Sequence, residues 1–146
     1  MLSKLQALLD LFAEYPDQAE RTQLLLDYAD KFKDVPAAVA TRPFDKAALV
    51  PHCESEAYVW AVPNGDGTLK LHFAVENPSG VSAKALAAML DRTLSGLPPE
   101  EIAKVDPEIV ERIFRQNISM GKGMGLMSMV QRVQALARRA LQEKTQ

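Results

Sequence analysis

The sequence contains a single cysteine, Cys53, among 146 residues, and it carries little net charge. One cysteine cannot form an intramolecular disulfide, so the stapled scaffold of a small secreted protein is excluded. The net charge of −2 lacks the basic excess that is typical of a nucleic-acid-binding domain. No uninterrupted apolar run reaches about eighteen residues, so the sequence predicts no membrane span.

The amino-terminal residues do not resemble a secretory signal. Asp10 and Glu14 interrupt the apolar residues there, and no small-residue cleavage site follows. Apolar residues make up 47% and charged residues 25% of the chain, as in ordinary globular proteins. We therefore expect a cytoplasmic protein with a single domain over residues 1–146 that binds neither nucleic acid nor a membrane.

Hydrophobic spacing predicts two amino-terminal helices. Over residues 3–15, leucines and a phenylalanine recur at intervals of three and four, and Ser3 is the expected N-cap. A second helix is expected over about 17–33, with its apolar residues on one side. A loop punctuated by prolines then leads toward Cys53.

Two strands joined by a tight turn form the predicted centre of the fold. AYVWAV and TLKLHFAV flank the segment PNGDG, whose Asn-Gly and Asp-Gly pairs supply the positive φ angles that hairpin turns require. Alternation in the second strand predicts one buried face and one wet face, on which His72 is exposed. The first strand is apolar on both faces and should be more enclosed. A third short strand before Cys53 is compatible with this pattern.

The remainder of the chain is predicted to be helical. One helix should run from Ser79 or Ser82 to Leu94, and shorter helices should begin in LPPEEIAKV and DPEIVERIF. A final helix is expected from Leu126 to about Gln142. The preceding SMGKGMG is interpreted as a hinge or close-approach loop, because its glycine spacing matches neither standard nucleotide-binding motif. These elements predict an α+β fold, with a small antiparallel sheet of two to three strands and a central hairpin packed against several flanking helices.

The surroundings of Cys53 favour chemistry over packing. His52, Glu54 and Ser55 make its neighbourhood polar, whereas a buried structural thiol normally lies in an apolar run. The charges of Glu54 and Glu56 disfavour a thiolate. This thiol is therefore better suited to accepting a group from a more reactive donor than to acting as a strong nucleophile. His52 is a poor base for its neighbour, because adjacent side chains on an extended segment point apart. The sequence therefore argues against a papain-like enzyme, and it has too few ligands for a metal site.

Several segments, taken in order, resemble the SufE family of sulfur-acceptor proteins, which act in iron–sulfur cluster assembly. PHCESEAYVW resembles the family's Pro-Gly-Cys-x-Ser-x-apolar-aromatic stretch, and LKLHFAV and GLPPEEIAKVDPEIV follow in the family's order. ISMGKGMGLMSMVQRV resembles the family's Ser-x-x-Arg-x-x-Gly-[Leu/Met]-x-x-Met ending. The resemblance extends from about Arg21 to Val133, and it implies a SufE/IscU-like fold.

The resemblance implies a role for Cys53 as the acceptor of a persulfide sulfur from a SufS-like cysteine desulfurase. The chain would then be a sulfur carrier and desulfurase activator rather than a stand-alone enzyme, and it would deliver sulfur to a SufBCD-like scaffold complex. The pyridoxal phosphate of this chemistry belongs to the desulfurase, so no cofactor is expected in the chain itself. A homodimer is also compatible with the resemblance. Ser55, Tyr58, Gly125 and Leu126 match the family's flanking patterns.

Three positions depart from the family pattern. His52 replaces the usual glycine, which would stiffen the loop around the cysteine. Lys122 stands where the family has arginine, and lysine cannot present the planar fork of a guanidinium group. Met124 stands where many members have a polar or basic residue. The candidate supporting or partner-binding residues around Cys53 are therefore His52, Glu54, Ser55, Lys122 and Gly125.

Three alternatives to sulfur transfer remain open. The chain could regulate a desulfurase without carrying sulfur, or Cys53 could be a redox switch that forms a sulfenic acid or a mixed disulfide. Cys53 could also be a small buried hydrophobic residue. The lack of a second cysteine suits a carrier, because no intramolecular disulfide can discharge the bound sulfur.

Overall fold

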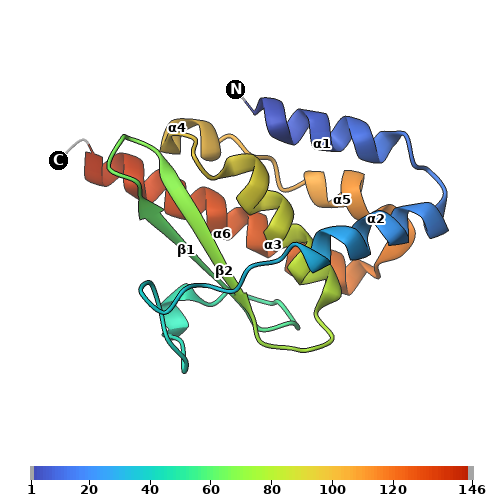
Figure 1. The fold of residues 1–146 in the computed structure, drawn as a ribbon, viewed down its shortest axis with the longest axis horizontal. Helices are drawn as coiled ribbons and strands as arrows, with labels where there is room; N and C mark the ends of the chain where they lie inside the picture. The colour runs from blue at the N-terminus through green and yellow to red at the C-terminus, as the bar shows by residue number, and fades with distance from the viewer. Residues whose placement is uncertain (1, 145–146) are drawn as a thin grey trace.

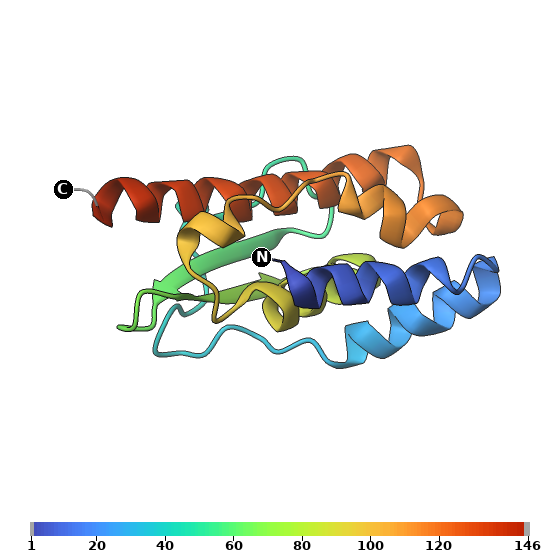
Figure 2. The ribbon, with the colours of Figure 1, turned by 90° about the horizontal axis from the view of Figure 1, so that it is seen from above.

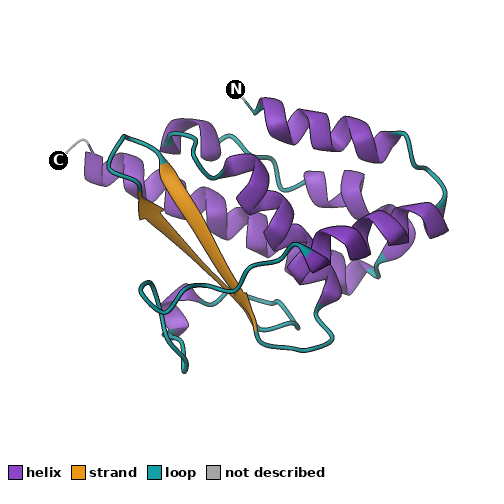
Figure 3. Cartoon of the chain, in the orientation of Figure 1, coloured by secondary structure: helices purple, strands orange, loops and turns teal. Residues whose placement is uncertain are grey.

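The computed structural model describes residues 2–144 of the chain (Figure 1). Helices lie mainly on one side of an antiparallel hairpin, so the expected α+β fold is confirmed (Figure 3). The elements are α1 (Ser3–Ala13), α2 (Gln18–Asp30), η1 (Lys46–Ala48), β1 (Ala57–Pro63), β2 (Leu69–Val75), α3 (Val81–Leu94), α4 (Pro99–Ile102), α5 (Ile109–Phe114), η2 (Arg115–Asn117) and α6 (Met120–Lys144). No helix among these combines the length and the apolar character that crossing a membrane requires.

The two amino-terminal helices form where the spacing predicts them. Helix α1 buries one apolar stripe, which consists of Leu5, Leu8, Leu9 and Phe12. It begins without a side-chain cap, because Leu2 occupies the N-cap position and Ser3 already belongs to the helix; the expected Ser3 cap is wrong. Helix α2 is capped by Asp17, whose carboxylate accepts hydrogen bonds from the amides of Ala19 and Glu20.

The hairpin pairs β1 with β2 in a regular antiparallel register from Ala57 opposite Val75 to Pro63 opposite Leu69. Both turn glycines, Gly65 and Gly67, have positive φ angles, 88° and 91°, as the Asn-Gly and Asp-Gly pairs predict. No third strand forms in the described part of the chain. The backbone of the segment before the hairpin pairs with the strands only as isolated bridges, Asp34 to Phe73 and Leu49 to Tyr58.

The second face of the hairpin is partly covered rather than wet along its whole length, which corrects the expected wet face. A small apolar cluster covers it, formed by Val35, Phe44, Ala48, Tyr58 and Ala74. The connection between α2 and β1 supplies the first three of these side chains. His72 is consequently half-buried rather than exposed.

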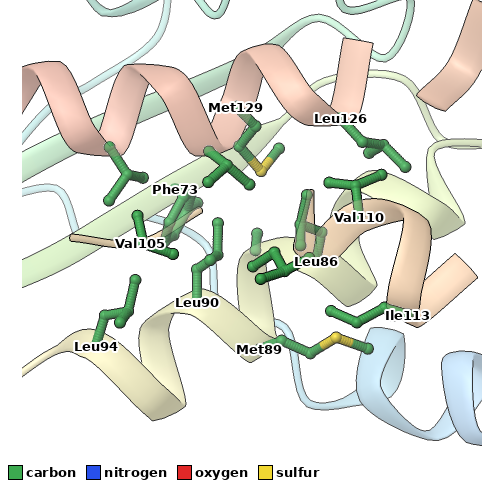
Figure 4. Close-up of a cluster of buried hydrophobic side chains, with 14 of the residues drawn as sticks. Phe73, Leu86, Met89, Leu90, Leu94, Val105, Val110, Ile113, Leu126 and Met129 are labelled. Carbon is green, nitrogen blue, oxygen red and sulfur yellow. The ribbon is translucent and has the colours of Figure 1, made fainter. Parts of the chain in front are cut away.

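The main core lies between the other face of the hairpin and the helices. Helices α3 and α6 both reach the hairpin (Figure 2). Figure 4 shows Leu86, Leu90 and Leu94 of α3 pointing toward Phe73 of β2 and Met129 of α6. Each such apolar side chain stabilises the fold by about 1.5–3 kcal/mol when it leaves water.

Helix α6 begins earlier than the sequence predicts. Its first residue is Met120, so the glycine-rich segment forms the first turns of the helix and is not a hinge or a loop. Ser119 caps the amino terminus of α6, because its hydroxyl accepts a hydrogen bond from the amide of Lys122 at 3.2 Å. The short helices α5 and η2 precede this start, whereas a phosphate-binding loop would follow a strand.

Candidate functional site

Cys53 lies in a short closed loop at the entrance to β1. The amide of Val50 donates to the carbonyl of Ala57 at 2.8 Å and closes the base of the loop. Within it, the amide of Glu56 donates to the carbonyl of Cys53 at 3.1 Å, which places Cys53 at the first position of a tight turn.

The side chain of Cys53 is half-buried beside a cavity of about 200 Å³. One wall is the cysteine loop itself, the second is the turn that leads into α3, and the third is the start of α6. The lining residues are Cys53, Glu54, Ser55, Asn77, Ser79, Gly80, Ser82, Ala83, Gly121, Lys122, Gly125 and Leu126. Cys53 also packs against the main core, so its sulfur lies between apolar side chains and an open space.

The amino terminus of α3 forms the second wall of the cavity. Gly80 is the N-cap residue, and no side chain accepts a hydrogen bond from the first turn of this helix. Uncapped amides at the positive end of a helix dipole favour a negative charge nearby. The amino terminus of α3 therefore adds positive potential to this wall of the cavity.

Backbone hydrogen bonds join the cysteine loop to the turn before α3. The amide of Asn77 donates to the carbonyl of Ser55, and the amide of Glu76 donates to that of Glu56, each at 3.1 Å. Gly80 packs so closely here that a Cβ would lie 3.1 Å from the Cβ of Ser55. These two walls are therefore held together by the backbone.

Gly125 brings the third wall against the cysteine loop. A Cβ at this position would lie 2.9 Å from the carbonyl oxygen of His52 and 3.2 Å from the Cα of Cys53. Only glycine allows α6 to approach the loop this closely without a shift. Gly125 is thus a close-approach residue, although it belongs to a helix rather than to the expected loop.

His52 contributes its backbone to the site. Its φ angle is 59°, in the left-handed region that glycine adopts freely and other residues adopt at a cost of about 1 kcal/mol. This conformation gives a physical reason for a glycine at this position of the cysteine loop. The imidazole is exposed and does not line the cavity.

Lys122 supplies the positive charge among the cavity residues, and Glu54 supplies the negative charge. The Lys122 side chain is exposed, and no ion pair within residues 2–144 engages it. It therefore remains available to a group that enters the cavity. Of the predicted site residues, Cys53, Glu54, Ser55, Lys122 and Gly125 meet at one cavity, whereas His52 borders it through its carbonyl only.

The sequence reasoning missed the wall formed by residues 77–83. Asn77, Ser79, Gly80 and Ser82 line the cavity, but they follow the far strand of the hairpin. The hairpin register could have revealed them, because Ala57 pairs with Val75 and thus brings both strand ends together. Among the described residues, no three histidine, cysteine or acidic side chains gather closely enough to hold a metal ion.

Two exposed methionines lie at the beginning of α6. Met120 and Met124 are 86% and 64% exposed, and both line a groove of about 450 Å³ between α6 and α5. Lys122 and Gly125 of the same helix turns line the Cys53 cavity. The first turns of α6 thus separate the cavity from an adaptable apolar surface.

Comparisons with known proteins agree with this geometry. A model of the SufE family, described as an Fe-S metabolism associated domain, matches residues 6–137. A solution structure of a hypothetical protein from Thermus thermophilus is similar, with 30% sequence identity and a TM-score of 0.73. The similarity covers 95% of this chain and 96% of that one. No curated protein matches the chain significantly. The chain therefore belongs to the SufE family, whose domain is associated with iron–sulfur metabolism.

Proposed function

We propose that the chain accepts a persulfide sulfur on Cys53 from a cysteine desulfurase and passes it on for iron–sulfur cluster assembly. The observation that carries this proposal is the position of Cys53, the only cysteine, beside a cavity with uncapped helix amides and a lysine. The family supports it, because a persulfide carrier acts within iron–sulfur metabolism.

The transfer is a thiol exchange that needs no external oxidant. The thiolate of Cys53 attacks the outer sulfur of the persulfide on the desulfurase, and a new S–S bond forms on Cys53. The old S–S bond breaks, and the donor cysteine leaves as a thiolate that can take up the proton lost by Cys53. One sulfur atom moves, and the total oxidation state is unchanged.

The chain's own residues hold and shield the product. A persulfide is more acidic and more reactive than a thiol, so it benefits from nearby positive charge. The first-turn amides of α3 and the ammonium group of Lys122 supply that charge at the cavity. The cavity volume of about 200 Å³ exceeds the share of one water molecule, about 30 Å³, and leaves room for an additional atom on Cys53.

The exposed methionines supply a contact surface beside the cavity. Met120 and Met124 are unbranched and adaptable, as docking surfaces require, and they lie on the same helix turns as Lys122. A desulfurase that docks there would bring its persulfide to the cysteine loop. The same contact would activate the desulfurase by removing its sulfur.

The experiment that tests this function measures the mass of the intact chain after incubation with a cysteine desulfurase and free cysteine. We expect a gain of one sulfur atom that dithiothreitol removes, and no gain in Cys53→Ser. A matched control moves the thiol: Cys53→Ser combined with Ser3→Cys keeps one cysteine, on the exposed start of α1. Equal loading of that double variant would show that any thiol suffices, and would overturn the proposal.

A further inference from the structure

A second cavity lies among the helices, and no residue of the hairpin lines it. Its volume is about 490 Å³, and it is formed where the end of α1, the start of α2 and the α5–η2 segment meet (Figure 1). It shares no lining residue with the Cys53 cavity. Its size falls within the range of pockets for small molecules, about 300–1,000 Å³.

A buried arginine forms part of its wall. Arg21 is 1% exposed, and its guanidinium donates to the carbonyl of Phe12 at 2.5 Å and to that of Ile113 at 2.7 Å. These carbonyls lie in the last turns of α1 and α5, at the negative ends of two helix dipoles. The guanidinium also lies 5.4 Å from the centre of the Phe12 ring.

No carboxylate neutralises this buried charge. Among residues 2–144, no salt bridge involves Arg21, and its Nε is buried without a hydrogen-bond partner. Burial and, to a smaller extent, the charge of nearby Arg115 lower the pKa of Arg21. The wall of the cavity thus carries a positive charge that helix-end carbonyls, and no carboxylate of the described residues, offset.

Two more arginines line the same cavity. Arg112 and Arg115 are exposed, and no ion pair within the described residues engages either side chain. Glu111 is the acidic residue among the lining, so three guanidinium groups face one carboxylate in a chain of net negative charge. The lining therefore has a net positive charge, which attracts anions.

The wall that carries these arginines is fixed in place. The side-chain amide of Asn117 donates to the carbonyl of Gln18 at 3.0 Å and to the hydroxyl of Thr22 at 2.6 Å. Gln18 in turn donates to the carbonyl of Gln116. Because these bonds join α2 to η2 across the cavity, the site is largely formed before a ligand binds.

We propose that this cavity binds a small oxyanion that carries phosphate or carboxylate groups. Arg112 and Arg115 provide the forked donors that match such groups in pairs, and Arg21 provides a fixed charge behind them. The cavity holds more than one phosphate-sized group, so a diphosphate or a tricarboxylate fills it better than a single phosphate.

Calorimetric titration of the full chain with pyrophosphate and, separately, with citrate tests the proposal and distinguishes the two anion types. We expect saturable binding of at least one of them, with affinity reduced about tenfold or more in Arg112→Gln/Arg115→Gln. Both positions are exposed, so this variant should fold, which circular dichroism checks. The titration contains no desulfurase and does not involve Cys53, so its outcome is independent of the proposed sulfur transfer.

The matched control is Arg138→Gln/Arg139→Gln, which removes the same charge from exposed positions of α6 outside the cavity. Its affinity should stay within twofold of that of the unchanged chain. No saturable binding of either anion, or equal weakening by the two double variants, would overturn the proposal. Equal weakening would mean that general charge attraction, and not this cavity, holds the anion.

Discussion

Gly125 of α6 lies against the carbonyl oxygen of His52, only 2.9 Å from where a Cβ on Gly125 would stand. This contact sets the distance between the final helix and the loop that carries Cys53. Two residues more than seventy positions apart in sequence thereby determine the shape of one cavity wall.

Replacing Gly125 with alanine should separate that wall from the loop. We expect Gly125→Ala to lower the free energy of unfolding by about 1–3 kcal/mol through overpacking, although alanine favours a helix. Urea denaturation measures this change, and the rate of Cys53 alkylation should rise in the same variant because the loop is displaced. Gly123→Ala is the control, since its Cβ would meet only Ile118, at an ordinary 3.6 Å. If both variants have the same free energy of unfolding, the close approach at Gly125 does not constrain the residue at this position.

The left-handed conformation of His52 predicts an asymmetric response to substitution. His52→Gly should change the unfolding free energy by no more than about 1 kcal/mol, because relief of strain offsets the added freedom of the unfolded chain. It should also accelerate Cys53 alkylation, because the loop becomes more flexible. His52→Ala removes the same imidazole but keeps the strain, so its alkylation rate should remain close to that of the unchanged chain. An equal acceleration in both variants would assign the effect to the lost imidazole.

Lys122 should influence sulfur loading through its charge. We expect Lys122→Gln to slow the transfer of sulfur from a desulfurase to Cys53 about two- to fivefold, the effect of one exposed charge. Lys122→Arg should keep the rate within about twofold. Single-turnover loading followed by mass spectrometry gives these rates. Lys4→Gln, at an exposed position of α1, should leave the loading rate unchanged. If Lys4→Gln slows loading as much as Lys122→Gln does, Lys122 acts only through the overall charge of the chain.

Arg21 should be important for stability, because its guanidinium donates hydrogen bonds to carbonyls in the last turns of α1 and α5. Arg21→Met leaves the buried carbonyls of Phe12 and Ile113 without their donor, so we expect a loss of about 3 kcal/mol or more in unfolding free energy. Urea denaturation provides the measurement. Arg138→Met, at an exposed position, should change stability by less than about 0.5 kcal/mol. A small loss in Arg21→Met would show that water can replace the guanidinium.

Acidification should weaken the fold through His72. Burial and, secondly, the charge of Lys70 lower the pKa of His72, while Asp91 acts in the opposite direction. The unfolded chain therefore takes up a proton at a higher pH than the folded chain does. Stability should be complete above the unfolded-state pKa of about 6.5 and should fall as the pH drops below it toward the folded-state pKa. Urea denaturation between pH 7.5 and pH 5.5 should show this slope, and His72→Gln should reduce it; an unchanged slope would assign it to other groups.

The sequence predicted the elements whose signals are local. The Asn-Gly and Asp-Gly pairs located the hairpin, and the spacing of Leu5, Leu8 and Phe12 located α1, since both patterns act within a few residues. Cys53 was identifiable because it is the only cysteine and has polar neighbours.

The start of α6 was not predicted, because its glycines have low helix propensity in isolation. Gly125 is required there by a contact with His52, and such a contact is invisible until the fold brings both segments together. Ser119 was the local signal that would have placed the helix start correctly. The burial of Arg21 was not predicted, because a charged residue is rarely buried, although Arg21 lies one helical turn before the buried Leu25 on the same face of α2.

The backbone bonds from Asn77 to Ser55 and from Glu76 to Glu56 join the cysteine loop to the turn before α3. In contrast, no hydrogen bond within the described chain joins residues 51–56 to α6, which approaches them closely at Gly125. The contact between the cysteine loop and α6 therefore contains no hydrogen bond. A partner that binds the exposed methionines of α6 would therefore act on the side of the cavity that no hydrogen bond ties to the cysteine loop, and the loop would stay bonded to the turn before α3.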